Sequence, residues 1–451
     1  MHKLFQLNFI AASITALMLT GCGDADTKIV EKDSIVAESD EHDHEDGEDD
    51  GYTIESMGRL AVLSAESNVT TLYDLNDNDL LDTFSLIHDS SSLTYSADYR
   101  FAIISNRSED YVGFIDGGLW REDHVEHLHD FQQAPAMSDF ELNSSRPTHI
   151  VKHDGKTAFF FDGDSESGTS ASVQVLSDTN ISSNISEVPT LSFDINMHGV
   201  AEPNGDYLVS TVRRDDAEST STNTILPDQV GIYHLHDGVY EQEQLLDITC
   251  PDLHGASQNG DYTVFGCSDG VLVVHEHDDV YEAEKIANID ALDGMRIADI
   301  YGHEESDSFI GIAGTTLFSI NPDNEMELLE WQPSEDVSVV SYSFSYEGEH
   351  FIVLDSEGYL NILSAHNHDG DINWELEERL DISEEDVSTM TDDMSFSMTM
   401  AQNGHYVYVA DPLAKHILQI NLETMSIDGD IEIDFIPDSL VWLGIEEEHE
   451  H

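Results

Sequence analysis

From residue 53 onward the chain alternates short apolar runs with polar turns, in units of about 40 to 55 residues. The turns are rich in Gly, Asn, Asp and Ser, and helical periodicity is nearly absent. This pattern predicts an all-β chain that forms a β-propeller of repeated four-stranded blades. The strand sets fall near residues 58–87, 90–140, 146–193, 197–248, 253–289, 295–331, 338–380 and 396–434.

These sets predict eight blades, and seven is the alternative because insertions in the 90–140 and 210–230 regions blur the boundaries. One strand, over residues 439–445, is left at the end of the pattern. We expect it to complete the first blade and so close the ring. The propeller then spans residues 53–446, and an acidic, histidine-containing tail follows over residues 447–451.

Residues 1–22 have the features of a secretory signal peptide. Lys3 precedes a largely apolar run over residues 9–19, which is too short for a stable membrane span. Small residues then lead to Cys22, in a pattern that resembles the lipobox of bacterial lipoproteins, whose cysteine is acylated. We therefore expect a periplasmic protein with a lipid anchor, and Gly23 favours the outer membrane. A plain signal peptide that contains a cysteine by chance is the alternative.

Residues 23–52 predict a disordered acidic tether. The segment around His42 and His44 has almost no apolar side chain, so it cannot offset the entropy lost on ordering. One interpretation is a solvated spacer. The other is a flexible arm that captures metal, because its imidazoles and flanking carboxylates are metal ligands on a mobile segment.

The charge of the chain excludes some partners. Its 451 residues include 93 acidic and only 16 basic side chains, which gives a formal net charge of −77 at pH 7 with histidine neutral. Nucleic acids and anionic membrane surfaces both require basic side chains and are excluded as partners. Cations are the natural partners, although acidic surfaces also occur in proteins from salty settings. Salt adaptation does not explain the 23 histidines.

Once Cys22 is assigned to the anchor, Cys250 and Cys267 remain as a pair in an exported chain. Such a compartment is oxidising, so we expect a disulfide between them. They lie on two short predicted strands joined by a turn, and a hairpin can bring them within bridging distance. A metal site that uses both cysteines is the alternative.

Three successive units share a register in which a histidine precedes a short strand, a polar turn and a more apolar strand. His149, His198 and His254 occupy this position. Because the first strand of each blade lines the central channel, we expect the three side chains to converge on the axis. Three imidazoles suit zinc, with a carboxylate or water as the fourth ligand. Ordinary histidines that are hydrogen-bonded to neighbouring backbone are the alternative.

A second cluster follows the predicted strand over residues 111–115, in an insertion that contains Asp123, His124, His127 and His129. In an extended chain His127 and His129 share one side, whereas in a helix His124 and His127 share a face. Either arrangement offers two nitrogens beside carboxylates, and we expect the loop to fold over the first three histidines as further ligands or to form a second site. A solvated polar loop is the alternative. The remaining pairs are expected to be surface histidines at blade edges: His234 and His236, His275 and His277, and His366 and His368.

No catalytic motif is present in the sequence, and we expect a protein that is not an enzyme. Several segments, however, resemble the AztD family of periplasmic zinc metallochaperones. The most specific is Cys-Pro-Asp-Leu-His-Gly over residues 250–255, continued through residues 264–274, and shorter matches lie at residues 122–124, 146–149, 160–163 and 197–199.

The resemblance covers most of the chain after residue 53 and implies a β-propeller that binds zinc. It also implies delivery of zinc to a partner, the solute-binding protein of a zinc ABC transporter. Two other functions remain open: a membrane-anchored propeller that serves as a protein-interaction platform, and a lactonase-like enzyme with calcium in its channel. A ring of oxygen ligands on the axis would indicate calcium, whereas three histidines indicate zinc.

Overall fold

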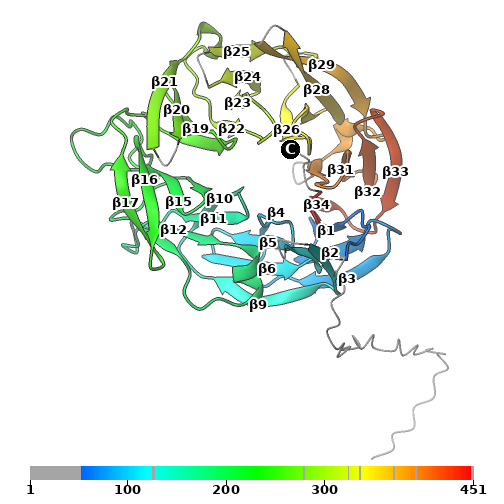
Figure 1. Ribbon diagram of the computed structural model, residues 1–451. Helices are drawn as coiled ribbons and strands as arrows, with labels where there is room; N and C mark the ends of the chain where they lie inside the picture. Colours follow the sequence, from blue (N-terminus) through cyan, green and yellow to red (C-terminus); the bar gives the residue numbers. More distant parts are fainter. Residues whose placement is uncertain are drawn as a thin grey trace, which may run out of the picture. The chain divides into compact units, whose positions relative to one another are not determined.

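The computed structural model describes residues 52–123, 127–277, 280–322, 325–334, 337–368, 371–391 and 394–447. Cys22, His42, His44 and His124 lie outside these residues, as do the signal peptide, nearly all of the tether and most of the tail. The described part is nearly all β, and its sheets are arranged in a ring (Figure 1). The all-β propeller that the sequence predicts is confirmed.

The described strands form eight four-stranded antiparallel units, and each unit runs from its innermost strand outward. The first unit contains β34 (Pro437–Leu443), β1 (Arg59–Ser64), β2 (Val69–Asp74) and β3 (Leu80–Ser85), and the second contains β4 (Ser92–Tyr95), β5 (Phe101–Asn106), β6 (Tyr111–Asp116) and β9 (Ala136–Leu142). The third contains β10 (Pro147–His153), β11 (Lys156–Phe161), β12 (Ser172–Leu176) and β13 (Thr190–Ser192), and the fourth contains β14 (Ala201–Asn204), β15 (Tyr207–Val212), β16 (Gln229–His236) and β17 (Val239–Leu245).

The second half of the ring repeats this plan. The fifth unit contains β18 (His254–Gln258), β19 (Tyr262–Cys267), β20 (Gly270–His277) and β21 (Val280–Ala287), and the sixth contains β22 (Asp299–Tyr301), β23 (Phe309–Ala313), β24 (Thr316–Asn321) and β25 (Glu325–Leu329). The seventh contains β26 (Val339–Phe344), β27 (His350–Asp355), β28 (Tyr359–His368) and β29 (Asp371–Asp381), and the eighth contains β30 (Ser397–Met400), β31 (Tyr406–Asp411), β32 (His416–Asn421) and β33 (Ser426–Glu432).

The third and fourth units share one continuous eight-stranded sheet. Their outer strands β13 and β17 are joined by a single parallel pair, in which Thr190 lies opposite Val239. Because this sheet crosses a boundary between two units, the division of the ring into eight blades stays a prediction.

The last strand closes the ring, as the sequence predicts. Strand β34 pairs antiparallel with β1, so that Arg59 lies opposite Leu443 and Leu63 lies opposite Ser439. The two strands lie side by side although they come from opposite ends of the chain (Figure 1). Trp442 of β34 is fully buried and donates from Nε1 to the carbonyl of Met57 at 2.9 Å.

Three short elements depart from the repeated strand pattern, and the sequence did not predict any of them as helices. Helix α1 (Asp178–Ser182) is capped at its N-terminus by Ser177, whose side chain accepts from the Asn180 backbone N–H. Two single-turn 3-10 helices cover Asp290–Leu292 and Val387–Thr389. None of the helices in the described ranges combines the length and the apolar character needed to cross a membrane.

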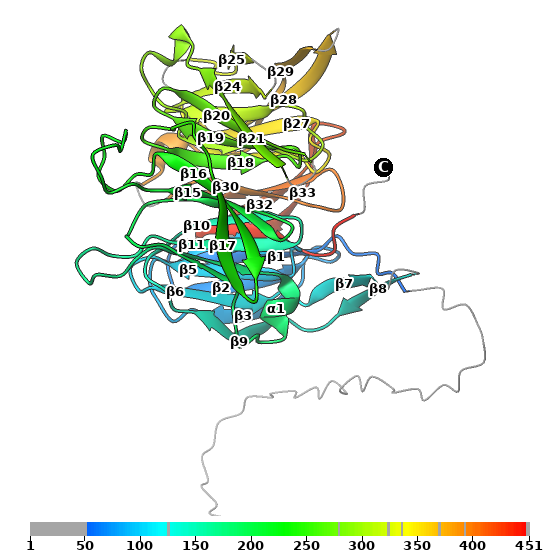
Figure 2. The same cartoon turned by 60° about the vertical axis from the view of Figure 1, so that its left-hand side comes forward.

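A hairpin of β7 (Leu119–Asp123) and β8 (Leu128–Gln132) is inserted between β6 and β9. It extends outward from the ring at one side in Figure 2. Tyr52 pairs with His129 of β8, so the start of the described chain adds to this small sheet.

The apolar core lies between neighbouring units, where the second and third strands of each sheet pack. The aromatic residues Phe114, Phe159 and Phe161 belong to one such cluster and are at most 1% exposed. The innermost strands are only half-buried in most positions and line a central cavity of about 660 Å³. Polar side chains are therefore tolerated along the axis, where the candidate site lies.

One buried acid in this cavity makes folding stability depend on pH. Glu202 is 1% exposed, and burial raises its pKa from 4.5 to about 8. Between these values the folded state holds a proton that the unfolded state has lost, so stability falls as pH rises, by up to about 1.4 kcal/mol per pH unit. We expect Glu202→Gln to flatten the decline in unfolding free energy between pH 5 and pH 8, measured by urea denaturation.

Glu109→Gln is the matched control, because the Glu109 side chain is 56% exposed. It should leave the slope of stability against pH unchanged. A Glu202→Gln slope equal to that of the wild type would show that Glu202 is ionised in the folded protein.

Candidate metal centre

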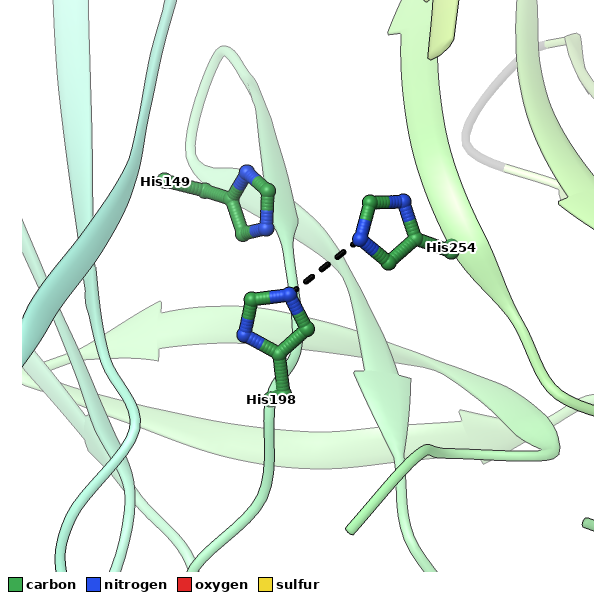
Figure 3. A group of neighbouring side chains, drawn as sticks. All are labelled: His149, His198 and His254. Carbon is green, nitrogen blue, oxygen red and sulfur yellow. Dashed lines mark hydrogen bonds between the residues drawn. The ribbon is translucent and has the colours of Figure 1, made fainter. Parts of the chain in front are cut away.

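Three histidines from successive units meet at one end of the innermost strands. His149 lies in β10, His198 precedes β14 and His254 begins β18. Figure 3 shows the three rings facing a common point, and each contributes a nitrogen that lies within 4.8 Å of the other two. The structure therefore brings together the three imidazoles that the sequence register predicts on the axis. We call this group the histidine triad.

The position of His198 is set by the neighbouring strand β11. Asp162 directly follows β11, and its carbonyl accepts from the Met197 N–H at 3.0 Å. Its carboxylate Oδ2 lies 3.0 Å from His198 Nδ1. Arg107 donates to the same oxygen at 2.7 Å. Burial acts to raise the Asp162 pKa, but the hydrogen bonds from His198 and Arg107 outweigh it, so the pKa lies below its ordinary value.

The position of His254 depends on its neighbour Gly255. Gly255 has φ +73°, and a Cβ there would lie 2.3 Å from the carbonyl oxygen of Ala298. A side chain at residue 255 would therefore be strained and would also displace this carbonyl. The same carbonyl oxygen lies 2.8 Å from His254 Nδ1. Glycine at this position thus lets the Ala298 carbonyl approach and orient the imidazole.

These outer partners fix the tautomers of two rings. A carbonyl only accepts, so His254 Nδ1 must carry a hydrogen, and the ionised Asp162 makes the same demand of His198 Nδ1. In the neutral imidazoles both Nε2 atoms then present lone pairs, yet they lie only 3.2 Å apart. Two opposed lone pairs at this distance repel each other unless a metal ion lies between them or a proton on one ring makes the contact a hydrogen bond (Figure 3).

The spacing of the two nitrogens fits zinc. Zn–N bonds of about 2.0–2.1 Å at a tetrahedral angle place neighbouring ligand nitrogens about 3.3 Å apart. The 3.2 Å between His198 Nε2 and His254 Nε2 is close to this value. Hydrogen bonds from the far ring nitrogens to a carboxylate and a carbonyl are also the usual outer shell of metal-bound histidine.

The surroundings of the third ring, His149, favour its neutral form. Its centroid is 5.0 Å from that of His198 and 5.8 Å from that of His254. Burial lowers the His149 pKa to about 4, and the neighbouring imidazoles of His198 and His254 contribute to this shift. The ring is therefore neutral at pH 7, the form in which imidazole binds a metal.

The predicted disulfide is present and supports the loop that leads to His254. Cys250 and Cys267 are bonded, with their Cα atoms 4.9 Å apart. The backbone of this loop is held by the Cys250 N–H, which donates to Asp228, and by the Leu253 N–H, which donates to Pro227. The bridge thus ties the end of β19 to the segment directly before the triad.

Sequence reasoning did not assign the outer partners Asp162, Arg107 and Ala298. Asp162 had a usable signal, because antiparallel pairing of β11 with β10 returns the end of β11 to the start of β10, where His149 lies. The Ala298 carbonyl had no signal in the sequence, because every residue provides a backbone oxygen and the residue type therefore does not identify it.

The two described histidines of the insertion, His127 and His129, are not part of the triad. His153, at the end of β10, lies 3.5 Å from Glu304, and Glu304 lines one cavity with Trp120 and Arg121 of β7. His149 lies four residues before His153 in the same strand, which is about 13 Å. The described part of the β7–β8 hairpin therefore lies toward the other end of the innermost strands, and His127 and His129 are not among the residues grouped at the triad.

A separate site on this hairpin stays a prediction. The rings of His127 and His129 are 4.7 Å apart, so the extended arrangement expected from the sequence is the one observed. Asp123 ends β7 and lies opposite Leu128. His124, between them, lies outside the described residues.

The fold and the site define a class: a β-propeller whose innermost strands carry a site of three imidazoles. No family model matches the chain. In sequence it is similar to the zinc chaperone AztD of Citrobacter koseri, with 23% identity over 397 residues that cover 86% of each chain. The resemblance that the sequence motifs indicate is thereby confirmed, and the chain is AztD-like.

The comparison with solved structures agrees in fold. The crystal structure of Citrobacter koseri AztD and the structure of its apo form each match with a TM-score of 0.69 and 21% identity. Each match covers 87% of this chain and 99% of the other.

Removal of the disulfide should affect both stability and the triad. We expect Cys250→Ser/Cys267→Ser to lower the unfolding free energy by roughly 3 kcal/mol, because the bridge closes a loop of moderate length. We also expect weaker zinc binding, since the loop before His254 loses its support. Chemical denaturation and zinc titration measure the two effects. Wild-type stability in the double variant would contradict the structural role of the bridge.

Proposed function

We propose that the protein is a zinc metallochaperone, in which the histidine triad holds zinc as cargo. The opposed Nε2 atoms of His198 and His254 carry this proposal, because in the neutral rings both lone pairs face one point, where a single zinc ion would bind both. The similarity to a protein named zinc chaperone AztD supports the same metal and the same role.

The ligand set favours zinc over calcium. Zinc accepts three nitrogen ligands and leaves a fourth position for water or an incoming ligand. Calcium requires six to eight oxygen ligands, and the triad offers nitrogen. The calcium-dependent lactonase considered from the sequence therefore has no support at this site.

The open fourth position suits a carrier rather than an enzyme. A chaperone must release its metal, and exchange proceeds by replacing ligands one at a time with those of the acceptor. The proposed role is therefore binding and transfer, without catalysis of a reaction. The proposed acceptor is the solute-binding protein of a zinc ABC transporter.

We further propose that the protein works in the periplasm, anchored through a lipid on Cys22. The segment over residues 23–52 would then act as a tether, and His42 and His44 would deliver metal to the propeller. His124, His127, His129 and Asp123 form the proposed second site on the inserted hairpin.

Loss of one triad ligand should abolish tight zinc binding. We expect His254→Ala to weaken the zinc affinity by more than about 100-fold, and Asp162→Asn by about 10- to 100-fold, because the second change removes only an outer partner. Competition titration with a chromogenic chelator measures both. His350→Ala is the matched control, since His350 lies in β27 of another unit and contacts Ser364. Unchanged affinity in His254→Ala would refute the triad as the zinc site.

Transfer to the acceptor should be direct. We expect the rate of zinc loss from the loaded protein to rise with the concentration of a zinc solute-binding protein. An excess of chelator should instead give a rate that is independent of its concentration and set by dissociation. Stopped-flow detection of the apo and loaded forms distinguishes the two. Equal rates with both acceptors would exclude a chaperone role and leave a storage role.

A further inference from the structure

Two neighbouring hairpins at the outer edge of the ring carry the same chemical pattern. The segments over residues 234–243, HLHDGVYEQE, and over residues 275–284, HEHDDVYEAE, agree at seven of ten positions. In both, the histidines end the third strand of a unit and the glutamates follow on the fourth strand. The sequence pattern predicts only surface histidines here, and in the first hairpin the structure adds their convergence with a carboxylate.

In the first hairpin the side chains of both strands meet at one point. Glu243 Oε1 lies 3.3 Å from His234 Nδ1 and 3.9 Å from His236 Nε2. The two imidazole centroids are 4.5 Å apart. One ligand atom from each of the three residues lies within 4.8 Å of the others.

The backbone explains why Glu243 reaches both rings. The register of β16 and β17 shifts by a β-bulge between Ile232 and Tyr233, beside which Glu243 is the extra residue. His234 and His236 share one face of β16 because they are two residues apart. Glu241, directly opposite His234, adds a second carboxylate to the same region.

The ring of His234 is also held in place from the other side. Tyr207 of β15 stacks on it with centroids 4.4 Å apart and an interplanar angle of 13°. The neighbouring unit repeats this contact, with Tyr262 stacked on His275 at 4.8 Å and 21°. A stacked and paired imidazole loses less side-chain freedom when it binds an ion, which lowers the entropy cost of binding.

We propose that His234, His236 and Glu243 form an exposed binding site for a divalent cation of the zinc class. Two nitrogens and one oxygen match the donors that zinc prefers, and water fills the open positions. The three side chains are 27%, 49% and 46% exposed, so the ion exchanges readily with solvent. The site is weaker than the buried triad and does not depend on it.

The test separates the two sites by working in the His254→Ala background, where the triad is disabled. Equilibrium dialysis against zinc at pH 7.5 gives the number of ions bound. We expect His234→Ala/His236→Ala to remove about one equivalent of zinc from this background, because a single ion is shared by both rings. Glu243→Gln should weaken the same site, and calcium should not occupy it.

His88→Ala is the matched control, because His88 is also exposed at the surface and has one carboxylate neighbour, Glu109, at 3.9 Å. It should leave the number of bound ions unchanged. The proposal would be overturned if the number of zinc ions bound were the same with and without His234 and His236. It would also be overturned if His88→Ala lost as many ions as the double variant. Circular dichroism verifies the fold of each variant.

In the background with an intact triad, the double variant should retain tight zinc binding, so failure of this proposal is distinct from failure of the triad.

Discussion

The pairing of β34 with β1 is the constraint on which the rest of the structure depends. It joins residues 437–443 to residues 59–64 and leaves no free edge between the last and the first unit. Within the closed ring the innermost strands of neighbouring units contact each other at the triad, where β10 contacts β14 and β14 contacts β18. The triad draws one histidine from each of three successive units, so its geometry holds only while these strands keep their places around the axis.

In the closed ring, the fold holds the imidazoles of the triad so close that the near nitrogens of His198 and His254 cannot move apart. The Ala298 carbonyl and the Asp162 carboxylate hold the hydrogens on the far ring nitrogens, and backbone hydrogen bonds fix the segments that carry the rings. When both rings are neutral and no metal is bound, the near nitrogens repel each other. A cation that removes this repulsion gains binding free energy from interactions that are already formed, which is preorganisation in its electrostatic form.

The sequence predicted the fold class, the convergence of His149, His198 and His254, and the bridge between Cys250 and Cys267, because each follows from a repeat register or from pairing. It failed where the outcome depends on three-dimensional contacts. The Ala298 carbonyl was missed because a backbone hydrogen bond across units leaves no periodic signal. Asp162 was missed although the pairing of β11 with β10 places it near the start of β10. The insertion with His127 and His129 could not be placed relative to the triad, since this requires knowing toward which end of the strands the loop between β6 and β9 projects. The convergence of His234, His236 and Glu243 was missed because a β-bulge shifts the alternation on which face assignments rest.

The net charge of −77 and the nitrogen ligands have different physical roles. A field of this sign raises the local concentration of every cation, including magnesium and calcium, and it cannot distinguish among them. Selection must therefore come from the donor atoms, because imidazole favours borderline metals such as zinc over hard ions that prefer oxygen. The buried triad adds a second level of selection, since its fixed 3.2 Å nitrogen spacing suits short tetrahedral bonds and leaves no cage for a larger, highly coordinated ion. The acidic surface raises the local concentration of cations, and the histidine site binds zinc in preference to the others. Both features are needed for a carrier that is selective in a medium rich in competing ions.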